Sequence, residues 1–313
     1  MLKFRRLVAG LLVVTAALVA SVAQAADSNK YLPNSAEGVV VINVKQLLEA
    51  PLVKNNLDTL KAMLTSAGDA QKILDEIGFD PFQDVETVTI AIDESPNKPL
   101  ILVQGKFDMA KIQTKAESAA KENSDVLTIG RAGGHTIYEV KAPEQNETMY
   151  VGLVDGTTVA ASPNKDYVVE VLDKKDGKKK AEMKKELKAL LAKADSKQTI
   201  SIVSLGGPLA ATGQPTAAKV ASIVGGINIS DEVKVELVLN TKNADDAKSL
   251  EGELKDGIDQ VKALVDLTAN QNKDLKPLVE AVDTLKVFSQ GTTVNIKGEL
   301  TKEVIKKLMA KGQ

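Results

Sequence analysis

One stretch of the chain returns near the C-terminus, and this repeat constrains the fold more than any other feature. Residues 151–172 read VGLVDGTTVAASPNKDYVVEVL, and residues 287–308 read VFSQGTTVNIKGELTKEVIKKL. Both stretches predict a strand, a tight turn, a second strand and a closing helix. The GTTV turns at 156–159 and 291–294 are 135 residues apart. The repeat therefore predicts two related halves that each close with this unit.

A second pair of segments is related by the same offset. Residues 100–117 align with residues 235–252, and each reads as a strand, a helix N-cap and a helix, with Asp108 and Asn243 at the caps. Two matches at one offset favour a duplication. We therefore expect an α+β protein of two related halves, 26–195 and 196–313. Each half is predicted to be an antiparallel sheet with helices packed on one face.

Residues 1–25 have the pattern of a secretory signal peptide. Lys3, Arg5 and Arg6 precede an apolar run at 7–19, and Ala23-Gln24-Ala25 forms an A-x-A cleavage site. The apolar run is short for a membrane span, although an uncleaved anchor is the alternative. We expect cleavage after Ala25 and no integral membrane span in the mature chain.

The composition of the mature chain excludes several classes of function. It has no cysteine, which excludes disulfides, thiolate metal sites and thiol nucleophiles and fits a bacterial periplasm or cell envelope. Outside the signal peptide the chain has 37 Lys and Arg against 42 Asp and Glu, and the only arginine among them is Arg131. Arginine is the main residue for bidentate phosphate recognition, so we expect no nucleic-acid surface.

The only histidine and the only mature arginine occur in one glycine-rich turn, Gly130–His135. Backbone N–H groups of such a turn can bind an anion, with Arg131, Gly133, Gly134 and His135 as the candidate residues. The simpler alternative is a β-turn whose glycines supply positive φ angles. We expect no catalytic role for Arg131 or His135. If the turn is exposed, we expect His135→Ala to cost only about 0.5 kcal/mol.

Other possible sites lack the partners that their chemistry needs. Ser118 and Lys121 match a serine–lysine nucleophile motif, but its companion motifs are missing. Two acidic pairs could bind calcium but do not follow the EF-hand series, and turn chemistry explains them equally well; these pairs are Asp80 with Asp84 and Asp93 with Glu94. We therefore expect no catalytic residue, no metal and no cofactor.

A lysine-rich segment at 174–197 connects the two halves, with ten lysines and four acidic residues. Its lysines could dock on an anionic membrane or polymer. Interleaved acidic residues and an apolar stripe are more typical of a solvated amphipathic helix, with Leu187, Leu190 and Leu191 buried. We expect this helix, and we expect residues 206–216, which are rich in Gly and Pro, to form a loop.

Several short motifs resemble those of a family of uncharacterised exported proteins that are common in planctomycete-type bacteria. They are Tyr31-Leu32-Pro33, the GFDP sequence at 78–81, the DGTTV sequence at 155–159 and the KDYV sequence at 165–168. The resemblance implies export and duplicated α+β halves. It brings no activity, cofactor or catalytic residue.

These observations favour an exported periplasmic or cell-envelope protein with a non-enzymatic role. We expect it to bind an unknown protein or envelope component, or to serve a structural role. A carrier that holds a hydrophobic ligand between sheet and helices is the alternative, and a hydrolase that uses two carboxylates comes third. A closed apolar cavity would favour the carrier, and facing carboxylates in a cleft would favour the hydrolase.

Overall fold

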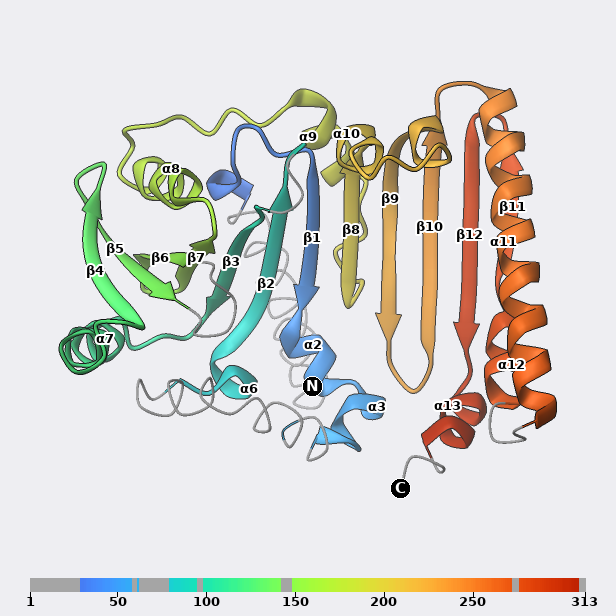
Figure 1. Cartoon of the computed structure of the whole chain (residues 1–313), viewed down its shortest axis with the longest axis horizontal. Coiled ribbons are helices and arrows are strands. Elements are labelled where there is room, and N and C mark those ends of the chain that lie inside the picture. The colour runs from blue at the N-terminus through green and yellow to red at the C-terminus, as the bar shows by residue number, and fades with distance from the viewer. Residues whose placement is uncertain are drawn as a thin grey trace, which may run out of the picture.

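One antiparallel β-sheet organises the structure, a computed structural model that describes residues 29–57, 61, 79–94, 98–141, 148–271 and 276–309. The sheet has 12 strands in the order β11-β12-β10-β9-β8-β1-β2-β3-β7-β6-β5-β4 (Figure 1). The strands are β1 (Gly38–Asn43), β2 (Val85–Ile92), β3 (Leu100–Gly105), β4 (Leu127–Ala132), β5 (His135–Lys141), β6 (Thr148–Asp155), β7 (Thr158–Ser162), β8 (Ile200–Leu205), β9 (Val220–Ile229), β10 (Val233–Thr241), β11 (Lys286–Gln290) and β12 (Thr293–Leu300). The protein is thus of the α+β class.

Helices connect the strands and cover the sheet. They are η1 (Asn29–Tyr31), α2 (Val44–Glu49), α3 (Pro51–Lys54), α6 (Pro81–Asp84), α7 (Met109–Glu122), α8 (Lys165–Lys175), α9 (Lys185–Leu191), α10 (Gly206–Ala210), η2 (Ala217–Lys219), α11 (Ala244–Gln271), α12 (Lys276–Asp283) and α13 (Lys302–Met309). Helix α11 lies beside β11 and β12 at one end of the sheet, and the β4–β5 hairpin forms the opposite end (Figure 1).

Short polar side chains begin several of these helices, as expected from the sequence. The Asp108 carboxylate accepts a hydrogen bond from Lys111 N at 3.0 Å, which caps α7. The Asn243 side chain accepts from Asp246 N at 2.8 Å at the start of α11. Each cap satisfies an N–H group that has no partner within its own helix. Both predicted caps are confirmed.

Two clusters of buried side chains lie on opposite faces of the sheet. The first includes Leu102 and packs beneath α8 and α9, and the second includes Leu239 and packs beneath α11. Residues that pair across neighbouring strands point to the same face of the sheet. Following the pairs outward from Leu102 gives, strand by strand, Thr89, Val41, Ser201, Gly226 and Glu236, so all of these residues share the face of Leu102. Because Leu239 is three residues beyond Glu236, its side chain points to the other face. Helices therefore cover both faces of the sheet as a whole, with α8 and α9 on one face and α11 on the other.

The sheet is continuous across the predicted boundary between the halves. Strand β1 pairs antiparallel with β8, for example Val39 with Val203. Both of these side chains are 1% exposed and belong to the first buried cluster. The residues on both sides of the predicted boundary consequently share a sheet and part of a core.

The lysine-rich segment differs from the single helix that we expected. Helix α8 ends at Lys175, residues 176–184 have no helical structure, and only Lys185–Leu191 forms α9. Gly177 follows the end of α8 and has a φ of 72°. A residue in this left-handed conformation cannot continue a helix, so α8 stops here. Leu187 is fully buried as expected, whereas Leu190 and Leu191 are only partly buried. Residues 206–210 form helix α10, where a loop was expected.

The predicted signal peptide at 1–25 lies outside the described residues. Among the residues that the structure describes, no helix is long and apolar enough to cross a membrane.

Candidate functional site

The glycine-rich turn forms the tip of the β4–β5 hairpin. Gly133 and Gly134 are its two loop residues, with φ angles of 60° and 84°. Two consecutive positive φ angles are typical of the hairpin turn whose twist matches that of the flanking strands. A side chain at Gly133 would also meet Val169 of α8, since a Cβ atom there would lie 2.8 Å from Val169 Cγ1. Turn geometry and close packing therefore account for both glycines.

His135 docks this hairpin tip onto the end of α8. Its Nε2 atom lies 2.8 Å from Asp173 Oδ1, and its Nδ1 atom lies 3.7 Å from Asp176 Oδ2. The imidazole is 9% exposed, and Lys178 Nζ lies 3.5 Å from Nε2. The negative charges of the two carboxylates disfavour the binding of an anion at this position. The anion-binding turn stays a prediction, and Arg131 is exposed on the neighbouring strand.

We expect His135→Ala to lower the free energy of unfolding by about 1–2 kcal/mol, because it removes a hydrogen bond to a charged group. This corrects the smaller cost expected for an exposed turn, because the side chain is nearly buried. Urea unfolding of the mature protein measures the effect. The control is Arg131→Ala, on the exposed part of the same hairpin, which should leave stability nearly unchanged. Equal effects of the two changes would contradict the docking role.

The side chains of the other candidates from the sequence are exposed or serve as local caps. Ser118 and Lys121 lie exposed on α7, and their side chains make no hydrogen bond or ion pair with any described residue. Asp80 caps α6 by accepting from Phe82 N at 2.9 Å. Asp84 in turn accepts from Asp80 N at 2.7 Å, so both residues have the turn role. Among the described residues, no group of three His, Cys, Asp or Glu side chains could hold a metal ion.

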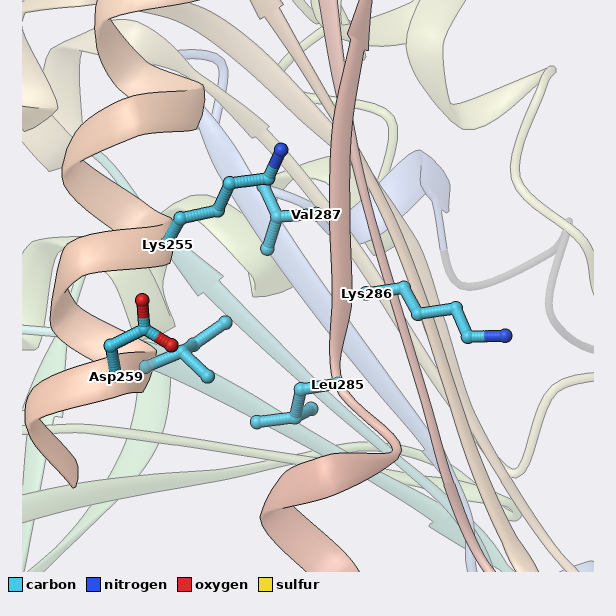
Figure 2. Close-up of a pocket in the computed structure, with 6 residues that line it drawn as sticks. Lys255, Asp259, Leu285, Lys286 and Val287 are labelled. Atoms are coloured by element: carbon cyan, nitrogen blue, oxygen red, sulfur yellow. The ribbon is translucent and has the colours of Figure 1, made fainter. Parts of the chain in front are cut away.

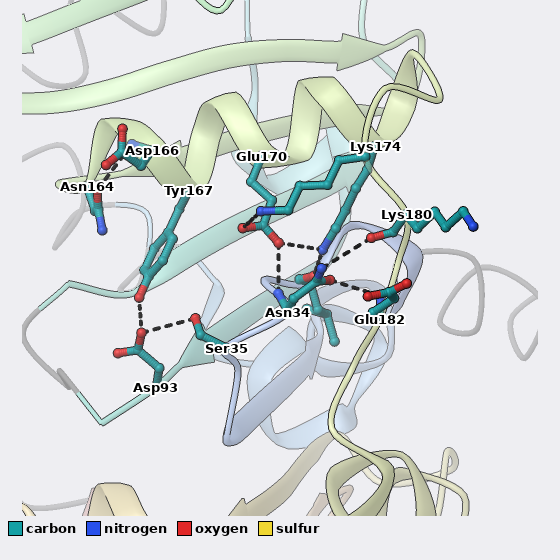
Figure 3. Close-up of polar contacts among 12 residues, drawn as sticks. Asn34, Ser35, Asp93, Asn164, Asp166, Tyr167, Glu170, Lys174, Lys180 and Glu182 are labelled. Carbon is teal, nitrogen blue, oxygen red and sulfur yellow. Dashed lines mark hydrogen bonds and ion pairs between the residues drawn. The ribbon is translucent and has the colours of Figure 1, made fainter.

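A buried ion pair that sequence reasoning missed lies on α8 (Figure 3). Lys174 Nζ lies 2.7 Å from Glu170 Oε1, and the side chains are 2% and 12% exposed. Glu170 also accepts from Asn34 N at 2.8 Å and pairs with Lys179 at 2.8 Å. Lys174 additionally donates to the carbonyl oxygen of Leu32. The i, i+4 spacing of the pair was visible in the sequence, but its burial was not.

The surroundings of this pair act on both pKa values. Burial works to raise the pKa of Glu170, but hydrogen bonds from Lys174, Lys179 and Asn34 N outweigh it and lower that pKa. Burial lowers the pKa of Lys174, against the effect of Glu170. Each partner offsets much of the desolvation cost of the other. The pair has the properties of a structural contact.

The same hydrogen-bond network connects Asn34, near the start of the described residues, to the segment that follows α8. The Asn34 amide donates to Lys180 O at 3.2 Å and accepts from Glu182 N at 2.9 Å (Figure 3). Nearby, Tyr167 and Ser35 both donate to the Asp93 carboxylate. Burial and the Asp93 contact raise the pKa of Tyr167 to about 12. The phenol therefore stays protonated near neutral pH and serves as a hydrogen-bond donor.

An exposed apolar row lies on the C-terminal half of α11. Val261, Leu264 and Leu267 are 51%, 64% and 61% exposed. By contrast, Ala247 and Leu250 near the start of the same helix are at most 1% exposed. The three exposed residues follow one another at intervals of three, so they share one side of the helix. We call Val261, Leu264 and Leu267 the α11 strip.

A shallow hollow lies on another side of α11, between this helix and β11 (Figure 2). Its volume is about 350 Å³, and its lining residues are Lys255, Ile258, Asp259, Leu285, Lys286 and Val287. The ammonium group of Lys255 pairs with Glu251 at 2.6 Å, while Lys286 points away from α11. The hollow is open and has a mixed apolar and charged lining.

Comparisons with known proteins identify no family for the chain. No protein-family model matches it, and no curated protein matches it. Among solved structures, crystal forms I and III of TP0453 are similar at 10% and 11% sequence identity, with TM-scores of 0.47 and 0.49. The similarity covers 90% of this chain and 95–96% of those chains. Similarity at this level assigns no function, and the resemblance to an exported family stays a prediction.

Proposed function

We propose that this protein is an exported, non-enzymatic protein of the periplasm or cell envelope that binds a partner protein through the α11 strip. The observation that carries the proposal is the exposure of Val261, Leu264 and Leu267 on one side of a single helix. Burying such a side chain contributes roughly 1.5–3 kcal/mol. Contiguous exposed apolar side chains are typical of interaction sites, whereas single ones are common on any surface.

We further propose that the chain arose by duplication and that the strip belongs to a part acquired by one half. Counting outwards from the β1–β8 pair, the strand orders β1-β2-β3-β7-β6 and β8-β9-β10-β12-β11 correspond. Helix α7 follows β3 as α11 follows β10, but α7 has 14 residues and α11 has 28. The strip lies in the additional length of α11. A specialised binding role for that extension agrees with this position.

The hollow of Figure 2 favours a second candidate function, a carrier of a small hydrophobic ligand. Ile258, Leu285 and Val287 would contact its apolar part. Carriers usually bury most of their ligand in a concave apolar site. The open, partly charged hollow supports this function less well than the strip supports partner binding.

Site-specific photo-crosslinking tests the leading proposal. A photoreactive amino acid at position 264 is expected to give one discrete protein adduct in the cells that naturally produce the protein. The control is position 129 on β4, where Ile129 is 38% exposed at the other end of the sheet. Absence of an adduct at 264, or the same adduct from both positions, would contradict a binding role for the strip.

N-terminal sequencing of the exported protein should give a sequence that begins at Ala26.

A further inference from the structure

We infer that the partner presents a basic amphipathic helix to the α11 strip. The inference rests on the proposed function and specifies the chemistry of the partner. It follows from the position of charged side chains around the helix. Helix α11 contains seven acidic residues and three lysines, and these two groups are not evenly distributed around it.

The lysines lie on the side of α11 opposite the strip. Lys248, Lys255 and Lys262 repeat at intervals of seven. At about 100° per residue, they lie roughly 160–180° away from Leu264. Their contacts agree with this placement. Lys262 pairs with Asp283 of α12, and Lys255 lines the hollow beside β11. The strip side of α11 therefore carries none of the lysines of this helix.

Acidic residues continue the line of the strip toward the N-terminus of α11. On the same helical geometry, Glu253 lies about 20° from Leu264, and Asp256 lies about 20° from Leu267. Glu253 contacts Lys219 and accepts from Thr216 at 2.6 Å. Asp256 is exposed and makes no ion pair with any described residue. Glu253 is thus already paired, and a ligand that extends along this side of the helix meets the unpaired charge of Asp256 beside apolar side chains.

This charge pattern separates the possible occupants. A second copy whose α11 lies parallel to this one would bring Asp256 against the same acidic group, which is unfavourable. An anionic lipid surface would meet the same repulsion. From Val261 to Leu267 the strip rises about 9 Å, close to two helical turns. A partner helix with apolar residues at intervals of three and four and flanking lysines matches both its length and its charge.

Two synthetic peptides of 18 residues test the inference. One has a leucine face flanked by lysines, and the other has the same leucines flanked by glutamates. Fluorescence anisotropy should show the leucine–lysine peptide binding the mature protein at least about tenfold more tightly than the leucine–glutamate peptide. The double variant Leu264→Gln with Leu267→Gln should weaken this binding about tenfold or more. Glutamine is a good helix former, so the helix should persist.

Further variants separate charge from contact area. Asp256→Lys should reduce the preference for the leucine–lysine peptide, and the control Ile129→Thr should leave binding unchanged. Equal affinity for both peptides, or wild-type affinity of the double variant, would overturn the inference. So would binding to phosphatidylglycerol vesicles that is lost in the double variant, or self-association lost in it. If position 264 crosslinks a partner in cells while the peptides fail, only the assigned partner chemistry is wrong.

Discussion

Replacing Glu170 by alanine is expected to lower the free energy of unfolding by about 3–5 kcal/mol. The change leaves the Lys174 ammonium buried without its carboxylate, and breaking a buried ion pair from one side costs about this much. Lys174 is 2% exposed, so water cannot replace the lost partner without rearrangement. The change also removes the acceptor for Asn34 N and Lys179. Urea unfolding monitored by circular dichroism measures the difference.

Two further variants show whether the buried charge causes this effect. Lys175→Ala, at the next position of α8, removes a lysine whose side chain is 44% exposed and should change stability by less than about 0.5 kcal/mol. The double change Glu170→Leu with Lys174→Met should recover much of the loss, because apolar side chains replace both charges. A loss below about 1 kcal/mol for Glu170→Ala would mean that the pair is solvated.

Leu250→Ala is expected to destabilise the protein by about 2–5 kcal/mol, whereas Leu264→Ala on the same helix should cost less than about 0.5 kcal/mol. Leu250 is 1% exposed and packs in the second buried cluster, so truncation leaves a cavity. Leu264 is 64% exposed and loses little packing. The pair compares one residue type in one helix, which removes differences in helix propensity.

The same unfolding experiment measures both leucine variants. Similar losses for Leu250→Ala and Leu264→Ala would mean that the strip is packed against the rest of the chain. The strip would then be unavailable to a partner, and the proposed binding role would fail together with the inferred partner chemistry.

Local structure could be predicted well because it depends on neighbouring residues. The alternation of apolar residues at 85–92 predicts β2, and the structure has the strand at those residues. Asp108 and Asn243 cap their helices as expected, since a cap needs only a short polar side chain near the first free N–H groups. Gly133 and Gly134 likewise adopt the positive φ angles that a tight turn requires.

The polar contacts around α8 could be predicted less well, because they join distant parts of the chain. Asp173 follows His135 by 38 residues, and Asn34 contacts Glu170 across 136 residues. No local pattern indicates such pairs. The lysine-rich segment shows the same limit, because Asn34 holds residues 180 and 182 by hydrogen bonds that compete with a continuous helix.

The sequence alone determined which residues form most strands, turns and helix starts, and its repeat predicted two related halves. Only the tertiary structure decided that β1 pairs with β8 to form one sheet and that the buried clusters face opposite ways. It also decided that Leu250 is buried while Leu264 is exposed, although both belong to one apolar pattern. Periodicity shows which side chains can share a face, but burial depends on whether another element packs there.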